Sequence, residues 1–263
     1  MDDKQQLKSL ADAATALQVR RLTRTGSALY LVFACWTGLV AAFRLPSYSG
    51  LGWLVCTVGM AFAGFYGISV KNPKSVLPVQ TGVAAAVAAY SAYRAFQPTE
   101  RIGIVFAIAA ARFAFAAWAG LRTYRTVECA PLDSQVFVGA AFTQASSGDP
   151  AKTPGLVALR RSSNLWSALT KRHEDYDYRL LFDRDIVFLI GIGSFLGLRY
   201  SPRIRLIAPS RTFRIDVVGE SLTGRRTKVL LMLDTDPVSD VLEITPEMLE
   251  KAREQAPRLA VRQ

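Results

Sequence analysis

Charge is almost absent from four long segments in the first half of the chain, and this constrains the fold more than any other feature. Residues 25–43, 45–70 and 75–93 carry no charge, and residues 102–121 carry only Arg112. A helix needs about 20 mainly apolar residues to cross the hydrocarbon core of a bilayer. The pattern therefore predicts four transmembrane helices. Their expected bounds are residues 26–43, 50–70, 76–96 and 102–121.

The overall composition supports a membrane protein. The 263 residues are 51% hydrophobic, with a mean hydropathy of +0.20 and a formal net charge of +11. Disorder is excluded, because disordered chains are poor in hydrophobic residues. A signal peptide is disfavoured as well, because the first apolar run begins only after 25 residues and three similar runs follow it.

The positive charges predict an orientation. Lys and Arg in short loops mark the cytoplasmic side of a membrane. They are frequent before the first predicted span, between the second and third, and after the fourth, at Lys4, Lys8, Arg20, Arg21, Arg24, Lys71, Lys74, Arg122 and Arg125. The opposite side has only Arg44, Arg94 and Arg101. We therefore expect both termini on the cytoplasmic side of a bacterial inner membrane, or on the matrix or stromal side of an organellar inner-type membrane.

The chain is expected to have three parts. Residues 1–25 form an amphipathic N-terminal segment, in which Leu7, Leu10, Ala14 and Leu17 are spaced for one helix face that lies on the membrane or packs on the soluble domain. Residues 26–121 form the four-helix transmembrane domain. Residues 122–263 form a small soluble α+β domain, because their mixed charge and regular turn signals are typical of a globular unit. The expected fold class is thus an α-helical membrane bundle followed by an α+β domain.

Several elements of the soluble domain are predicted. Residues 212–218 and 228–234 form a hairpin, because they flank a glycine-bounded turn at residues 219–224. Residues 245–255 form a helix with Thr245 as N-cap and a proline at its first position. Residues 160–172 are a second expected helix, and residues 144–155 are an expected flexible loop.

The apolar segment 185–200 allows more than one interpretation. Its uncharged core, residues 186–198, is too short to cross a bilayer as a helix. A buried strand and turn is favoured, and an interfacial or re-entrant segment is the alternative. Gly191, Gly193 and Gly197 resemble a dinucleotide-binding fingerprint, but Pro202 interrupts the helix that such a site requires. We expect no cofactor.

Arg112 is the sharpest candidate for a functional residue, because charged side chains within the membrane are costly and usually functional. The predicted spans contain no Asp, Glu, His or Lys. Arg112 could therefore bond to intramembrane polar residues such as Gln80 or Tyr90, a lipid phosphate, an anion in a pore, or an acid on another subunit. Pairing with a partner chain or a lipid is favoured.

The third and fourth spans are also rich in small residues spaced four apart, which let helices approach closely. These pairs are Gly82 with Ala86, Ala85 with Ala89, Ala107 with Ala111, and Ala110 with Ala114. Packing within the same bundle is the favoured explanation, and contact with neighbouring subunits is the alternative.

Basic residues form two candidate binding sets for lipids or partners. The first set precedes the first span, at Arg20, Arg21 and Arg24. The second lies in the soluble domain, at Arg199, Arg203, Arg205, Arg211, Arg214, Arg225, Arg226 and Lys228. Lipid headgroups or an acidic protein are favoured over nucleic acid, because only Tyr200 and Phe213 are available to stack on bases. A merely solvated sheet face is the alternative.

No catalytic or metal motif is evident. His173 is the single histidine, in an acidic segment that we interpret as a solvated loop, and CxxC spacing is absent, so no metal site is expected. We expect a non-enzymatic accessory, assembly or scaffold subunit of a larger membrane complex, whose partners are lipids and other membrane subunits or further copies. One alternative is a small oligomeric channel or transporter in which Arg112 selects anions. Another is a membrane-tethered enzyme acting on lipids, with candidate acids Asp175, Asp177, Asp183 and Asp185.

Overall fold

The computed structural model describes most of the chain and divides it into two compact units. The described residues are 3–70, 72–97, 101–161, 178–183, 185–192, 194–195, 198–199, 202–221 and 224–255. One unit is Thr15–Cys129, which we call the helical unit. The other combines Met1–Ala14 with Ala130–Gln263, and we call it the soluble unit after the domain expected there. The first helix contributes residues to both units.

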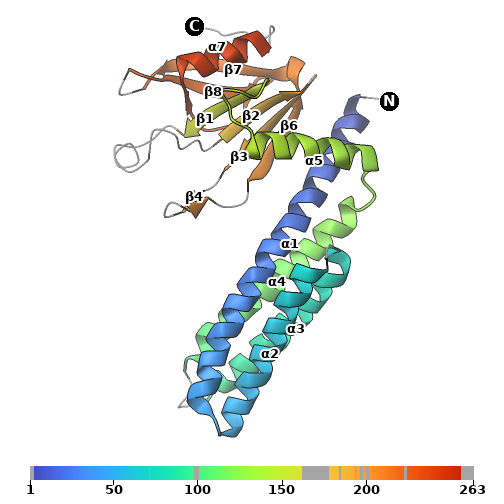
Figure 1. Ribbon diagram of the computed structural model, residues 1–263, viewed down its shortest axis with the longest axis vertical. Helices are drawn as coiled ribbons and strands as arrows, with labels where there is room; N and C mark the ends of the chain where they lie inside the picture. Colours follow the sequence, from blue (N-terminus) through green and yellow to red (C-terminus); the bar gives the residue numbers. More distant parts are fainter. Residues whose placement is uncertain are drawn as a thin grey trace. The chain divides into compact units, whose positions relative to one another are not determined.

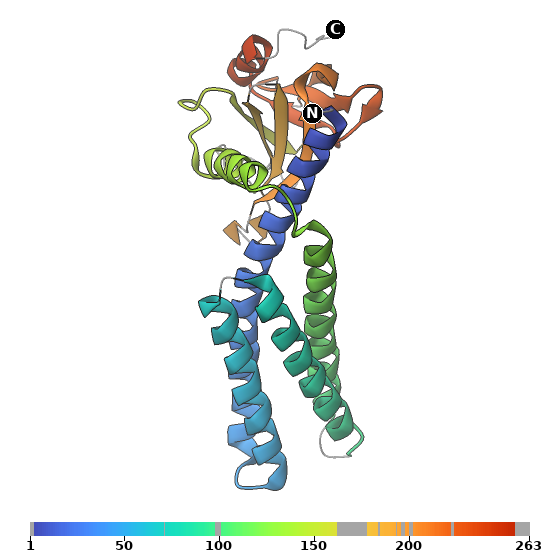
Figure 2. The same cartoon turned by 90° about the vertical axis from the view of Figure 1, so that its right-hand side faces the viewer.

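Four long helices dominate the first half of the chain: α1 (Asp3–Arg44), α2 (Tyr48–Ser69), α3 (Pro73–Ala95) and α4 (Gly103–Val127) (Figures 1 and 2). Each is long and apolar enough to cross a membrane. The four predicted spans are therefore confirmed as helices. The largest differences from the predicted bounds are in α1, which includes nearly the whole leading segment, and in α4, which continues six residues beyond Leu121.

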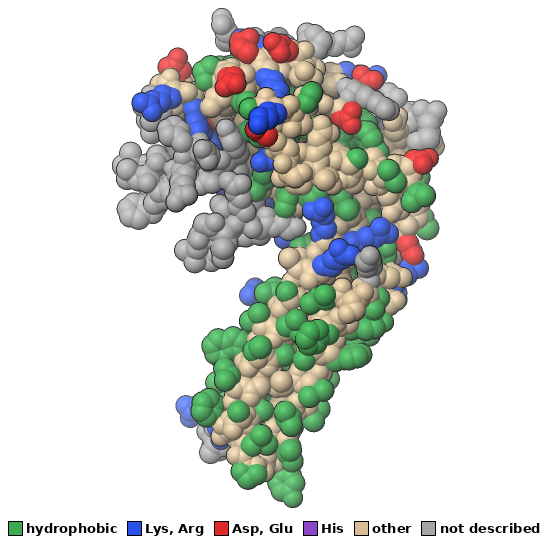
Figure 3. Space-filling view, viewed as in Figure 1, with side chains coloured by type: hydrophobic (Ala, Val, Ile, Leu, Met, Phe, Trp, Pro, Cys, Tyr) green, Lys and Arg blue, Asp and Glu red, His purple; other side chains and the backbone are tan. Residues whose placement is uncertain are grey.

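The interior of the helical unit is built around a few large side chains and many small ones. Trp53 and Met60 of α2 are fully buried, and they pack with Tyr30 of α1 and Phe106 of α4. Large apolar side chains such as Phe65 are exposed on the outside, and Figure 3 shows apolar side chains over the visible face of this unit. An apolar exterior is the arrangement expected of helices in a bilayer.

The structure corrects the expectation for the small residues of α3. Gly82, Ala85, Ala86 and Ala89 are all exposed on the outside of the helical unit. Of the two pairs on α4, Ala110 with Ala114 behaves as expected, because Ala110 is fully buried and Ala114 packs against the same core. In the other pair, Ala107 is half-buried and Ala111 is exposed. The sequence pattern could not distinguish the two cases, because both sides of a membrane helix are apolar.

The soluble unit contains an antiparallel sheet. Its strands are β1 (Leu156–Arg161), β2 (Tyr178–Asp183), β3 (Ile186–Gly191), β6 (Arg203–Pro209), β7 (Phe213–Glu220), β8 (Thr227–Leu233), β9 (Asp236–Pro237) and β10 (Leu242–Ile244). The order is β6-β3-β2-β1-β10-β8-β7, with β9 beside β8. The terminal strands β6 and β7 are joined by the short 3₁₀ helix η1 (Ser210–Thr212), so the sheet curls on itself. Strands β4 (Ser194–Phe195) and β5 (Leu198–Arg199) form a separate pair.

Two helices cover the sheet. Helix α7 (Pro246–Gln255) buries Met248 and Leu249 in the main core with residues of β1, β2, β3, β7, β8 and β10. Helix α5 (Leu132–Ser147) contacts β2 and β3, and its Phe137 ring lies 5.8 Å from the ring of Phe188. Side chains of the central strands are therefore buried on both faces, which explains their nearly continuous apolar sequences.

Several predictions for the soluble unit are confirmed. The expected hairpin corresponds to β7 and β8, and the segment from residue 186 begins with the buried strand β3. The expected C-terminal helix is α7, and the Thr245 hydroxyl accepts a hydrogen bond from the Met248 N–H at 3.4 Å.

Other predictions for this unit are wrong or lie outside the described residues. Helix α5 was not expected, and its last turn replaces the start of the loop predicted at residue 144. Arg160 and Arg161 belong to strand β1 and not to a helix. The rest of that predicted helix, together with His173, Asp175 and Asp177, lies outside the described residues.

The N-terminal end of α1 packs on the soluble unit, which is one of its two expected placements. Leu10 and Ala14 are buried, and residues up to Ala14 group with the soluble unit. The Ser9 hydroxyl lies 3.1 Å from the hydroxyl of Ser134 on α5.

Candidate functional site

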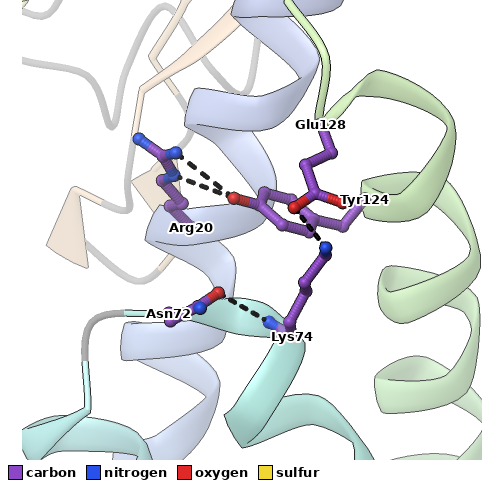
Figure 4. Close-up of polar contacts among 5 residues, drawn as sticks. All are labelled: Arg20, Asn72, Lys74, Tyr124 and Glu128. Atoms are coloured by element: carbon purple, nitrogen blue, oxygen red, sulfur yellow. Dashed lines mark hydrogen bonds and ion pairs between the residues drawn. The ribbon is translucent and has the colours of Figure 1, made fainter.

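Polar side chains of α1, α3 and α4, with Glu128 just after α4, meet at one end of the helical unit (Figure 4). Arg20 of α1 donates hydrogen bonds from Nη2 and Nε to the Tyr124 hydroxyl of α4, at 3.2 and 3.4 Å. Lys74, in the first turn of α3, forms an ion pair with Glu128, which follows α4. The segments predicted to lie on the inner side of the membrane are therefore together in space.

Further basic residues belong to the same parts of α1 and α4. Arg24 of α1 and Arg125 of α4 are exposed, and Arg21 is half-buried. Arg122 of α4 is exposed and lies over the Trp118 ring, with its guanidinium carbon 5.8 Å from the ring centroid. We call these residues, with Arg20 and Lys74, the basic end of the bundle.

The predicted polar residues Gln80 and Tyr90 are occupied inside the bundle. Gln80 is 2% exposed, and its amide Nε2 donates to the Ser27 hydroxyl at 2.9 Å. The Tyr30 hydroxyl donates to the backbone carbonyl oxygen of Gln80 at 3.3 Å. The Tyr90 hydroxyl donates to the Ser49 carbonyl at 3.2 Å. These contacts join helices across the bundle. The sequence does not single out Ser27 and Tyr30, because single Ser and Tyr residues are common in apolar helices.

Arg112 lies elsewhere, on the outside of α4. Its side chain is exposed, and no hydrogen bond or ion pair joins it to any residue that the structure describes. The structure therefore does not bring Arg112 together with Gln80, which is buried. Arg112 instead lies in a shallow depression of about 620 Å³ on the outer face of α4. The depression is lined by Arg112 with Ile108, Ala111, Phe115 and Ala116.

The basic residues of the soluble unit do not form one free surface. Arg203 and Arg205 are exposed on the terminal strand β6, and Arg211 is exposed in η1. Arg214 is half-buried, with its Nε 3.3 Å from the Asp216 carboxylate. Arg226 is only 8% exposed. The remaining predicted residues lie at different positions: Arg225 in the exposed β7–β8 turn, Lys228 opposite Glu243 in the sheet, and Arg199 in strand β5.

The described residues contain no cluster of three or more His, Cys, Asp or Glu side chains that could hold a metal ion. Of the acids nominated for a lipid-acting enzyme, Asp183 is the last residue of β2 and Asp185 is exposed in the following turn.

Comparisons with known proteins give no family: no protein-family model matches the chain, and no curated protein matches it. Any functional assignment therefore depends on the residues described above.

Proposed function

We propose that this protein is a non-enzymatic subunit that helps to assemble or scaffold a larger membrane complex. In this proposal the four helices lie in a bacterial inner or organellar inner-type membrane, and the soluble unit lies on the inner side. The observation that carries the proposal is the exposed position of Arg112 on an apolar helix face.

The charge of Arg112 raises the free energy of inserting α4 into the membrane if this helix face is in contact with lipid. Insertion scales assign about 2.5 kcal/mol or more to an arginine at the centre of a transmembrane helix. Its exposed neighbours Ile108 and Phe115 are apolar, so the same face supplies no polar group to offset that cost. A partner protein that covers this face and offers acceptors removes the penalty. The free helical unit is thus better suited to a complex than to isolation in lipid.

The coverage of the helices supports the same proposal. Only 17% of the most apolar window of α4 is buried, compared with 28% to 33% in the other three helices. Helix α3 also presents its small residues outward, including Gly82 and Ala86. Small outward residues permit a second helix to approach the backbone closely. Both helices therefore have surface available for neighbouring subunits.

Purification of the full chain from its own membrane in mild detergent tests this proposal. We expect native mass determination to show a stoichiometric complex with at least one different membrane protein. An unrelated four-span protein, expressed at the same level and purified in the same way, is the control for nonspecific capture. A monomer without partners would contradict the proposal. A closed homo-oligomer that passes anions in reconstituted vesicles would contradict it too, in favour of the channel alternative.

A further inference from the structure

We infer that Arg112 docks against a carboxylate in a transmembrane helix of a different protein. The inference rests on the proposed function, and it adds the position of the contact and the chemistry of the partner. Four observations lead to it: the depth of Arg112 in its apolar run, its fixed positive charge, the absence of acids from the predicted spans of this chain, and the residues around Arg112.

Depth argues for a protein partner and against a lipid phosphate. Arg112 lies nine residues after Gly103 and nine before Leu121, the last residue of the apolar run. At about 1.5 Å per residue, the guanidinium-bearing position is about 14 Å from either end of that run. This is close to half the roughly 30 Å thickness of the hydrocarbon core. Neither headgroup layer is within reach without local thinning of the bilayer.

The charge of Arg112 argues for a carboxylate. A guanidinium stays protonated in proteins, so Arg112 cannot lower its cost by losing a proton. Its planar fork matches the two oxygens of a carboxylate, and charge-assisted pairs of this kind are about twice as strong as neutral hydrogen bonds. The low dielectric of the membrane interior strengthens the attraction further.

A second copy of this chain is a poor partner for the same face. The single carboxylate between Asp12 and Glu128 is Glu100, which lies outside the apolar runs. A copy therefore offers no acid at the depth of Arg112. A two-fold symmetric contact centred on the depression would also bring two Arg112 side chains together, and like charges repel strongly at low dielectric. The acid must come from a different chain.

The residues around Arg112 fit a partner helix that has small residues beside its acidic residue. Ala111 and Ala116 are small, exposed residues beside Arg112, and Ile108 and Phe115 are larger exposed apolar residues beside it. Short side chains beside Arg112 let a partner backbone approach, which brings a short acidic side chain to the guanidinium. The expected partner segment is an apolar helix with one central Asp or Glu and small residues within one turn of it.

Designed peptides in vesicles test the inference directly. The full-length protein carries a donor fluorophore in phosphatidylcholine vesicles, and the acceptor is a synthetic Leu–Ala transmembrane peptide with a central Glu or a central Gln. We expect the Glu peptide to associate roughly tenfold more strongly than the Gln peptide. The Arg112→Leu variant is expected to remove this preference. Trp36→Leu is the matched control, because Trp36 is also large and 60% exposed but lies on α1.

The outcomes separate this inference from the proposed function. Equal association of both peptides with the wild-type protein, or an unchanged preference in Arg112→Leu, would overturn the inference. Loss of the preference when phosphatidylglycerol is added would also overturn it, because the headgroup would then be the ligand. If the purified native complex keeps its composition in Arg112→Leu, the inference fails while the proposed function stands. The Arg112→Leu variant is expected to unfold at the same temperature as the wild-type protein, because the side chain is exposed and forms no hydrogen bond or ion pair with any described residue.

Discussion

At the scale of single residues, two glycines in neighbouring helices have opposite environments. A Cβ atom at Gly67 of α2 would lie 2.1 Å from the Ser27 hydroxyl and 2.6 Å from the Gln80 amide nitrogen. A Cβ atom at Gly82 of α3 would have no heavy atom within 4 Å. Gly67 is therefore required by the close packing around the buried Ser27–Gln80 hydrogen bond, and Gly82 is not required by any packing within the described bundle.

We predict that Gly67→Ala destabilises the helical unit by about 1–3 kcal/mol, the usual range for overpacking. Gly82→Ala is the control, and it should be neutral or stabilising by up to about 1 kcal/mol, because alanine is the better helix former. Unfolding in mixed SDS micelles, followed by circular dichroism, measures both variants. Equal shifts for the two variants would show that the approach of α2 to its neighbours is not tight at residue 67.

The sequence singles out Arg112 as an isolated charge, but it does not predict which side of α4 carries it. An isolated charge in an uncharged run is visible in the sequence, whereas the side of the helix that faces the bundle is not. Apolar periodicity marks the inner face of a helix in water, but a membrane helix is apolar on both sides. Trp53 illustrates the same limit. It is a reasonable interfacial anchor by its sequence position, yet it is fully buried between the helices.

At the scale of secondary-structure elements, helix α5 depends on a side chain from the sheet. Arg179 of β2 is buried, and its Nη1 donates to the carbonyls of Ala145, Ser146 and Gly148 at 2.7, 3.2 and 2.9 Å. These carbonyls lie at the C-terminal end of α5, where helical partners run out. A positive charge there also interacts favourably with the helix dipole. Arg179 therefore closes α5 and fixes it to the sheet.

Arg179→Met is expected to release the last turn of α5. Removal of the buried charged donor leaves three carbonyls without it, so we expect a loss of about 2–4 kcal/mol in local stability. Hydrogen exchange of the full chain should show faster exchange in peptides from α5. Arg203→Met is the control, because Arg203 is exposed on the terminal strand β6. Unchanged protection of α5 in Arg179→Met would contradict the capping role.

This contact also explains which elements the sequence could predict. Strand β3 and the β7–β8 hairpin are encoded locally, by a continuous apolar run and by alternation around a turn. Helix α5 has small and polar residues near its end, so residues 144–147 look like the start of a loop. Their helical conformation is supported by Arg179, which is more than 30 residues away in the sequence. The helix propensities of residues 144–147 do not predict such a long-range contact.

At the scale of the whole molecule, local sequence signals predict the number of long apolar helices but not the strand order. Each span needs only its own length and apolarity, so the count follows from charge gaps. The sheet order places β10 between β1 and β8, and it joins the two terminal strands through η1. The pairing of β1 with β10 places Arg160 opposite Glu243, far away in the chain, and apolar patterns do not specify which strand pairs with which.

The two ends of the helical unit differ in charge, and this difference leads to a prediction about orientation. Arg20, Lys74 and Arg125 belong to the basic end, which follows the rule that Lys and Arg stay on the inner side. Cys129 is exposed just beyond α4 at this end, and Ser47 is exposed in the α1–α2 connection at the other. We therefore expect Cys129 to react with a membrane-impermeant maleimide only when the inner side faces the reagent.

A second variant, with its cysteine at the opposite end of the bundle, provides an internal control for this orientation test. In a Cys35→Ala background, the wild-type Cys129 should be labelled in inside-out vesicles and protected in right-side-out vesicles. Combining Cys129→Ala with Ser47→Cys should reverse the pattern, because residue 47 lies at the opposite end of the bundle. Labelling of both positions from one side would mean that the helices do not cross the membrane. Reversal of both patterns would place the basic end outside, which contradicts the expected orientation while leaving the four spans intact.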